Sequence, residues 1–272
     1  MSRIKSCFAE LKAKSRTALI PYVMAADPVP EITLPLMHAM VEAGANIIEL
    51  GAPFSDPMAD GPVIQLAAER SLKHDTSLLD VFELVKAFRE TDDKTPVIVM
   101  GYLNPIEVMG YQKFAKLAAA SGIDGVITVD MPPVEAGDYA PALQSEALDP
   151  IFLLAPTSTE ERIKKLANIA SGFVYYVSLK GVTGAATLDV SSVEQKVAEI
   201  RQHIDLPIGV GFGISDAESA AKVGVCSDAV VVGSAIVKQM TLNEGKTEPE
   251  RDIIIKEISD ILLSMRTALD AI

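Results

Sequence analysis

The chain alternates between short apolar segments and longer stretches in which apolar residues recur every three or four positions. Eight apolar segments are found, at residues 18–24, 46–50, 96–102, 125–129, 150–155, 173–179, 207–211 and 228–232. Most of them are continuous apolar runs, which is the pattern of a strand buried on both faces of a parallel sheet. We therefore predict one parallel strand for each segment.

The stretches between the segments predict helices. In residues 77–90 and 159–170 the side chains that repeat at helical spacing are Val81, Leu84, Val85, Phe88, Ile163, Leu166, Ala167 and Ala170. An extra helix is predicted at the N-terminus, where Ile4, Phe8 and Leu11 share one face. Three helix starts have the serine and glutamate of a capping box, namely Ser158 with Glu161, Ser191 with Glu194 and Ser215 with Glu218.

Eight strand–helix alternations in one chain of this length favour a closed (β/α)8 barrel, the TIM barrel, over a doubly wound open sheet. No linker rich in Pro, Gly or Ser divides the chain into halves, so we predict a single α/β domain across residues 1–272. In such barrels the chemistry lies at the C-terminal ends of the strands. The loops that follow the eight segments are therefore the places to search for functional residues.

Composition narrows the class of partner. With 24 basic and 37 acidic side chains in 272 residues, the chain has a formal net charge of -13, which disfavours nucleic acid or an anionic membrane surface. No apolar run approaches the roughly 18 residues of a membrane span. Cys7 and Cys226 lie far apart, outside any CxxC pair or His cluster, so neither a disulfide nor a metal site is predicted. A reducing, cytoplasmic location is expected.

Two carboxylates stand out near the end of the second segment, in IIELGAPFSDPMADGP. Glu49 lies inside an apolar run, where burial would raise its pKa into the range useful for general acid and base catalysis. The alternative is a structural ion pair inside the barrel. Asp60 lies in the loop that follows, where it is either a second catalytic carboxylate or a turn residue that forms local hydrogen bonds.

Glycines follow the last two segments, in VGFGIS and VVVGSAIVK. Gly211, Gly213, Gly233 and Ser234 could present backbone amides to an anion, and a short helix from Ser234 onward would direct its N-terminus at a phosphate. The alternative is that the glycines only form tight turns. After the sixth segment, SLKGVTGAATLDVSS suggests a mobile lid over residues 181–192, in which Gly184 could add another amide.

Apolar side chains near the strand ends predict a flat pocket for an aromatic substrate that carries a phosphate. They are Tyr22, Met100, Tyr102, Leu153, Tyr175 and Phe212. Lys180 occupies the position at which some Schiff-base aldolases carry their nucleophile, and it is otherwise an exposed lysine of the lid.

The motifs ELGAPFSDPMADGP, GVTGA, GFGIS and GSAIVK occur in the order found in the tryptophan synthase α subunit, and the sequence resembles that family over its whole length. The resemblance implies a TIM barrel that cleaves 1-(indol-3-yl)glycerol 3-phosphate to indole and glyceraldehyde 3-phosphate. It also implies a pyridoxal-phosphate β subunit as partner, in an α2β2 complex. The chemistry itself calls for no metal and no organic cofactor.

The resemblance carries over to individual residues. Glu49 matches the general acid and base of the family, and Asp60 matches the carboxylate that faces the indole nitrogen. The positions that match phosphate contacts are Gly184, Gly213 and Ser234, with Gly211 and Gly233 in the same motifs. Those that match the indole pocket and its lid are Tyr102, Tyr175, Thr183 and Phe212. Three positions depart from some members of the family. Tyr22 stands where some have phenylalanine, Met100 where some have leucine, and Leu179-Lys180 where some have an Arg-Ser pair.

The long loop at residues 52–62 is stiffened by prolines and predicts a contact with the partner chain. Pro53, Phe54, Asp56 and Met58 would form an exposed mixed patch on it, with Pro53 and Asp56 as the residues we assign to the contact. Two other functions remain open from the residues themselves. One is another phosphate-binding barrel, either a sugar-phosphate isomerase or an aldolase using Lys180, and the other is a catalytically silent barrel that activates a partner.

Overall fold

The computed structural model describes residues 2–178, 189–211, 213–241, 245 and 248–272. Its strands are β1 (Ala18–Met24), β2 (Ile48–Gly51), β3 (Val97–Gly101), β4 (Gly125–Thr128), β5 (Asp149–Ile151), β6 (Leu153–Leu154), β7 (Val174–Val177), β8 (Ile208–Gly211) and β9 (Ala229–Val232). All the pairings between them are parallel, in the order β5-β4-β3-β2-β1-β9-β8-β7-β6. The predicted parallel sheet is thus confirmed.

The fifth predicted strand is interrupted, and this break is where the sheet closes. β5 pairs with β4, whereas β6 pairs with β7, and only Phe152 separates the two short strands. The carbonyl of Phe152 accepts a hydrogen bond of 3.1 Å from the amide of Tyr175, so the interrupted segment bridges both ends of the sheet. The result is the predicted eight-stranded TIM barrel, in which β5 and β6 together form the fifth strand.

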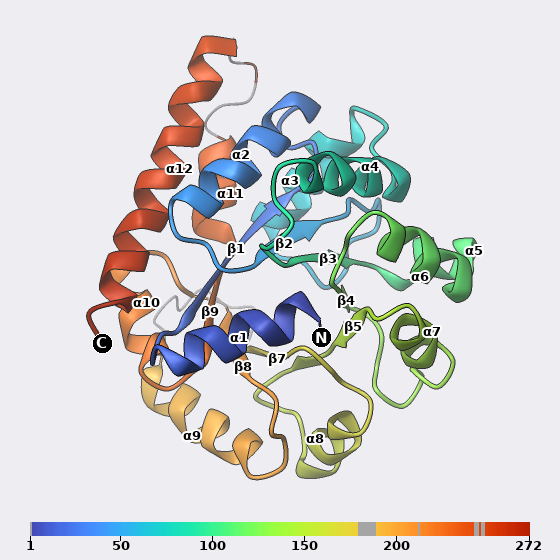
Figure 1. The fold of residues 1–272 in the computed structure, drawn as a ribbon, viewed down its shortest axis with the longest axis vertical. Helices are drawn as coiled ribbons and strands as arrows, with labels where there is room; N and C mark the ends of the chain where they lie inside the picture. Colours follow the sequence, from blue (N-terminus) through green and yellow to red (C-terminus); the bar gives the residue numbers. More distant parts are fainter. Residues whose placement is uncertain (1, 179–188, 212, 242–244, 246–247) are drawn as a thin grey trace.

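Helices surround this barrel (Figure 1). They are α1 (Arg3–Ala13), α2 (Pro30–Glu42), α3 (Pro62–Leu72), α4 (Leu78–Arg89), α5 (Leu103–Met109), α6 (Tyr111–Ala120), α7 (Tyr139–Ser145), α8 (Glu160–Ala167), α9 (Val190–Arg201), α10 (Ala217–Gly224), α11 (Ser234–Thr241) and α12 (Glu248–Leu269). A large core lies between their inner faces and the outer face of the sheet. No helix in the described part of the chain is long and apolar enough to cross a membrane.

The predicted N-terminal helix is confirmed as α1, which lies across one mouth of the barrel in Figure 1. Its Ile4 and Phe8 are buried among interior side chains of the strands, and the rings of Phe8 and Phe173 are 5.8 Å apart. These contacts involve the N-terminal ends of the strands, so α1 closes the end of the barrel opposite to the expected chemistry.

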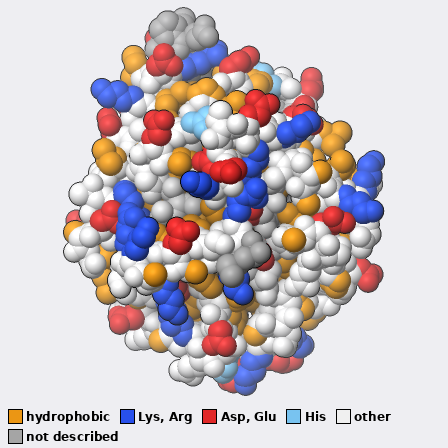
Figure 2. Space-filling view, in the orientation of Figure 1, with side chains coloured by type: hydrophobic (Ala, Val, Ile, Leu, Met, Phe, Trp, Pro, Cys, Tyr) orange, Lys and Arg blue, Asp and Glu red, His pale blue; other side chains and the backbone are white. Residues whose placement is uncertain are grey.

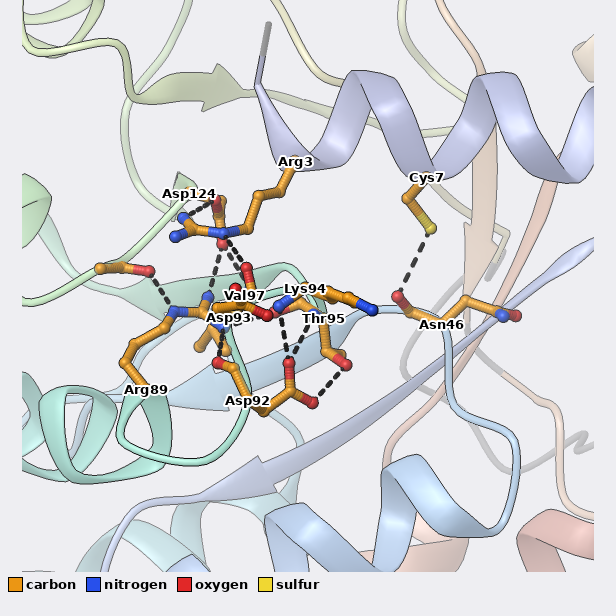
Figure 3. A network of polar contacts seen from close by, with 11 residues as sticks. Arg3, Cys7, Asn46, Arg89, Asp92, Asp93, Lys94, Thr95, Val97 and Asp124 are labelled. Carbon is orange, nitrogen blue, oxygen red and sulfur yellow. Dashed lines mark hydrogen bonds and ion pairs between the residues drawn. The ribbon is translucent and has the colours of Figure 1, made fainter.

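A polar network fastens α1 to the strands (Figure 3). Asp124, at the start of β4, accepts hydrogen bonds from Arg3 of α1 at 2.9 Å, from Arg89 of α4 at 2.8 Å and from the amide of Val97 at 2.9 Å. On the face drawn in Figure 2, acidic and basic side chains are interspersed and form no single basic patch.

The predicted capping boxes are wrong in position. The residues that cap α8, α9 and α10 are Thr159, Asp189 and Asp216, which lie one or two residues from the predicted serines. Each accepts a hydrogen bond from the amide three residues on, and Asp216 forms its capping box with Ser219. Because α9 already begins at Val190, the predicted lid at 181–192 is also too long at its C-terminal end.

Candidate active site

Glu49 lies in β2, in register with Tyr22 of β1 and Ile98 of β3. Only 1% of the Glu49 surface is exposed, and its Oε2 has no hydrogen-bond partner among the described residues. Burial, together with the nearby charge of Asp60, raises the pKa of Glu49 to about 8. The carboxyl group is therefore mostly protonated at neutral pH and able to give up a proton. Among the described residues, no basic side chain forms an ion pair with Glu49, so the alternative of a structural ion pair is not supported.

Asp60 lies in the loop between β2 and α3, close enough for its charge to act on Glu49 of β2 and Tyr22 of β1. The hydroxyl of Tyr102 donates a hydrogen bond of 3.1 Å to Asp60 Oδ2. Burial raises the pKa of Asp60 to about 6, and the hydrogen bond from Tyr102 acts in the opposite direction. At neutral pH Asp60 is thus mostly ionised while Glu49 is mostly protonated, so the two carboxyl groups differ in charge.

The loop that carries Asp60 is held at several points. The side-chain amide of Gln65 donates to the carbonyl of Asp60 at 2.8 Å, and the amide of Ala59 donates to the Tyr102 hydroxyl at 2.9 Å. The rings of Phe54 and Tyr102 stack at 5.0 Å. The sequence did not reveal these roles of Gln65 and Tyr102. Tyr102 was predicted only as a wall of the pocket, because its hydrogen-bond partners lie about forty positions away in the chain.

Four of the predicted pocket residues lie inside the barrel. Tyr22 and Met100 pack in one cluster with α3 and α11, and Met100 also packs with Leu153 and Tyr175 in the interior cluster. The two tyrosine hydroxyls lie over glycines of neighbouring strands. A Cβ added to Gly51 would be 2.3 Å from the Tyr22 hydroxyl oxygen, and one added to Gly211 would be 2.3 Å from that of Tyr175.

The predicted phosphate-binding positions that the structure describes lie at the ends of β8 and β9. Gly211 ends β8, and Gly213 has a φ of +79°, a conformation that favours glycine. Gly233 follows β9, and Ser234 begins α11, which confirms the short helix predicted there. The remaining positions assigned from the sequence, Lys180, Thr183, Gly184 and Phe212, lie outside the described residues.

The loop at 52–62 is less exposed than predicted. Asp56 and Met58 are exposed, but Pro53 and Phe54 are only half-exposed. The ring of Phe54 stacks on Tyr102 and is partly covered by it. Two large apolar side chains that the sequence did not single out are exposed in the next two strand-to-helix connections. Val108 of α5 is 83% exposed and Val134, after β4, is 69% exposed, compared with 85% for Met58.

Comparisons with known proteins agree with this architecture. The family model of the tryptophan synthase alpha chain matches residues 8–261. The tryptophan synthase alpha chain of Thioalkalivibrio sulfidiphilus is 61% identical over 270 residues, which cover 99% of this chain and 100% of that protein. That of Nitrosococcus oceani is 57% identical over 271 residues, covering 100% and 98%.

Solved structures give the same result. The crystal structure of tryptophan synthase subunit alpha from Legionella pneumophila superimposes with a TM-score of 0.92 at 42% identity, covering 100% of both chains. An aminoacrylate-bound tryptophan synthase from Mycobacterium tuberculosis gives a TM-score of 0.86 at 32% identity, covering 99% of this chain and 100% of that one. With a matching family model, close relatives and the same barrel, the chain belongs to the tryptophan synthase alpha chain family, whose members are lyases that cleave indole-glycerol phosphate.

Proposed function

We propose that Glu49 and Asp60 divide the work of a retro-aldol cleavage of 1-(indol-3-yl)glycerol 3-phosphate to indole and glyceraldehyde 3-phosphate, a step in tryptophan biosynthesis. The observation that carries this assignment is the pair of carboxyl groups at one mouth, with the pKa of Glu49 raised to about 8 and that of Asp60 to about 6. Groups whose pKa values are pushed apart can act as acid and as stabilising charge at the same pH.

The reaction needs both charge states. The bond to be broken joins the indole ring to the glycerol chain, and its electrons need an acceptor, so the ring carbon is first protonated by Glu49. This step leaves a positive charge at the ring nitrogen, which the Asp60 carboxylate stabilises. The ionised Glu49 then removes the proton of the substrate hydroxyl, a carbonyl forms, and the electrons of the broken bond return to the ring. Glu49 ends the cycle protonated, as it began.

The rest of the site supplies binding. Tyr22, Met100, Leu153 and Tyr175 present aromatic and apolar surface to the indole. Gly211, Gly213, Gly233 and the N-terminus of α11 at Ser234 would hold the phosphate through backbone amides, as in other barrels that bind phosphate after their last two strands. From the family resemblance, Gly184, Thr183 and Phe212 complete the phosphate site and the pocket. The whole chain, residues 1–272, would act as one domain without a metal or organic cofactor.

Two substitutions test the assignment. Glu49→Gln keeps the shape but loses proton transfer, so turnover should fall by about 100- to 10,000-fold with substrate binding retained. Asp60→Asn keeps a hydrogen-bonding group but loses the charge, so kcat should fall far more than substrate affinity. Indole release in steady state and substrate binding by calorimetry give the two readouts.

The controls are Glu83→Gln and Asp252→Asn, which make the same chemical changes at exposed positions outside the loop at 52–62. A Glu49→Gln protein that kept more than about a tenth of its activity would remove Glu49 from the proton transfers. Equal losses of rate and affinity in Asp60→Asn would make Asp60 a binding residue only.

The exposed apolar side chains at the mouth support a partner. Met58, Val108 and Val134 follow β2, β3 and β4, three adjacent strands, and so form one side of the rim together with Asp56 and Pro53. Exposed apolar residues in such a group are typical of a protein interface. We assign this rim to a pyridoxal-phosphate β subunit, in an α2β2 complex in the cytoplasm. Cys7 and Cys226 are both free, which suits a reducing compartment.

Binding at this rim should change the rate, because the loop that carries Asp56 and Met58 also carries Asp60. Adding a β subunit should raise the cleavage rate at least about tenfold, or roughly 1.4 kcal/mol of barrier. Asp56→Lys should weaken the complex, measured by analytical ultracentrifugation, without changing the thermal unfolding of the isolated chain. Asp252→Lys, an exposed position on α12, is the matched control. Undiminished association of Asp56→Lys would exclude this rim as the interface.

A further inference from the structure

The hydroxyl of Tyr102 has a fixed direction. Its oxygen accepts a hydrogen bond from the amide of Ala59 at 2.9 Å, and it lies 3.1 Å from Asp60 Oδ2. A phenol has a single proton, and an ionised carboxylate can only accept. The proton of Tyr102 therefore points at Asp60, and the two bonds together fix the positions of both Asp60 and the preceding residue.

Tyr102 itself is held rigidly. It directly follows β3, is the residue before α5, and is only 4% exposed. Its ring stacks on Phe54 with an interplanar angle of 26°, and the amide of Leu103 donates to Asp130 at 2.8 Å. The donor that faces Asp60 thus belongs to the strand framework, whereas Asp60 belongs to a loop. A rigid donor can hold a loop carboxylate in place before substrate arrives.

The bond also favours the ionised form of Asp60. Burial raises the pKa of Asp60 and the Tyr102 hydrogen bond lowers it, with a net value of about 6. Among the described residues, the titratable groups that face Asp60 are Glu49 from β2, Tyr22 from β1 and Tyr102, while Asp130, after β4, faces Tyr102. The pKa of Tyr102 is raised well above its ordinary range, so it stays a donor at neutral pH.

We infer that Tyr102 is a positioning residue that acts through Asp60, keeping this carboxylate in place and charged for the cleavage step. The inference rests on the proposed role of Asp60, and it assigns to the Tyr102 hydroxyl the task of holding and charging that carboxylate. It gives Tyr102 a role beyond that of a pocket wall, because the acting part is the hydroxyl rather than the ring.

Tyr102→Phe tests this, because it keeps the stacked ring and removes only the hydroxyl. At about pH 6 we expect kcat to fall on the order of tenfold with KM little changed, as for the loss of a hydrogen bond to a charged group. The acid limb of the kcat profile should move to higher pH, because Asp60 loses a partner of its charged form. The loss should shrink as pH rises. Tyr111→Phe, on α6, is the control for removing a phenol elsewhere.

A double-mutant cycle tests the role of Tyr102 separately from the proposed catalytic role of Asp60. In an Asp60→Asn background, Tyr102→Phe should have little further effect, as measured in single turnovers at high enzyme concentration. If the two losses instead multiply, or if Tyr102→Phe lowers kcat equally at every pH, the hydroxyl serves the loop structure and the inference fails while the role of Asp60 stands. If Asp60→Asn alone costs no activity, both fail together.

Discussion

Burial of the Glu49 carboxyl group lowers the free energy of unfolding at pH values where the group would ionise in water, and this loss can be measured. The pKa of this buried carboxyl rises to about 8 from the ordinary 4.5, so between these values the native protein holds a proton that the unfolded chain has released. The unfolded state binds fewer protons, and the free energy of unfolding accordingly falls as pH rises through this window. Below the ordinary pKa the penalty disappears, because both states are protonated.

Glu49→Gln removes this titration while keeping the side-chain shape. We expect the variant to gain stability over the parent as pH is raised from about 5 to about 9, with little or no gain at the lower value. Urea unfolding at the two pH values measures the difference. A gain of the same size at both would show that Glu49 is not protonated in the native protein.

The sequence could predict Glu49 because a carboxylate inside an apolar run is visible without any structure. It could not predict the packing that Gly51 allows, since the Tyr22 hydroxyl that needs the space comes from another strand and depends on the register. For the same reason Tyr102 was placed in the pocket but not beside Asp60. Residues with a local signal were found, and contacts between distant segments were not.

Among the elements, strands and helices were predicted well but their ends were not. The apolar periodicity places α4 and α8 within one to three residues of the observed bounds. The sequence places the caps on the wrong residues because several neighbouring side chains can accept hydrogen bonds from the free amides of a first helical turn. At α9, for example, Asp189 rather than Ser191 is the acceptor. The break at Phe152 was also missed, because the two halves differ only in their pairing partners.

Helix α3 directly follows the loop that carries Asp60, and a buried ion pair fixes its position. Arg70 of α3 donates to Asp27 at 2.6 and 2.9 Å, and both side chains are at most 5% exposed. Arg70→Met would leave a buried carboxylate without this partner, so we expect a loss of about 3 kcal/mol or more of unfolding free energy. Urea unfolding measures it.

The matched double variant Asp27→Leu with Arg70→Met should be more stable than Arg70→Met alone, because no buried charge is left behind. If the double variant is the less stable of the two, packing of the arginine stem rather than charge pairing holds α3.

At the scale of the whole molecule, the two ends of the barrel have separate tasks. The Asp124 network at the N-terminal end joins α1, β3, β4 and α4, and it lies opposite the mouth that holds Glu49 and Asp60. Asp124→Ala removes the shared acceptor of two guanidinium groups, so we expect about 3 kcal/mol of destabilisation by urea unfolding.

In the same variant kcat/KM should stay within about twofold of the parent, since residues at this end of a barrel contribute stability rather than chemistry. A large loss of kcat/KM in protein that is still fully folded would mean that the two ends are coupled. Either measurement is made on the intact chain, well below its unfolding temperature.

The helix across the N-terminal mouth also decides how molecules enter and leave. Because Ile4 and Phe8 of α1 fill that end, the barrel is open to solvent only at its C-terminal mouth. Substrate and both products must then pass the same rim. Whatever sits on the rim therefore governs both the intake of substrate and the exit of the products.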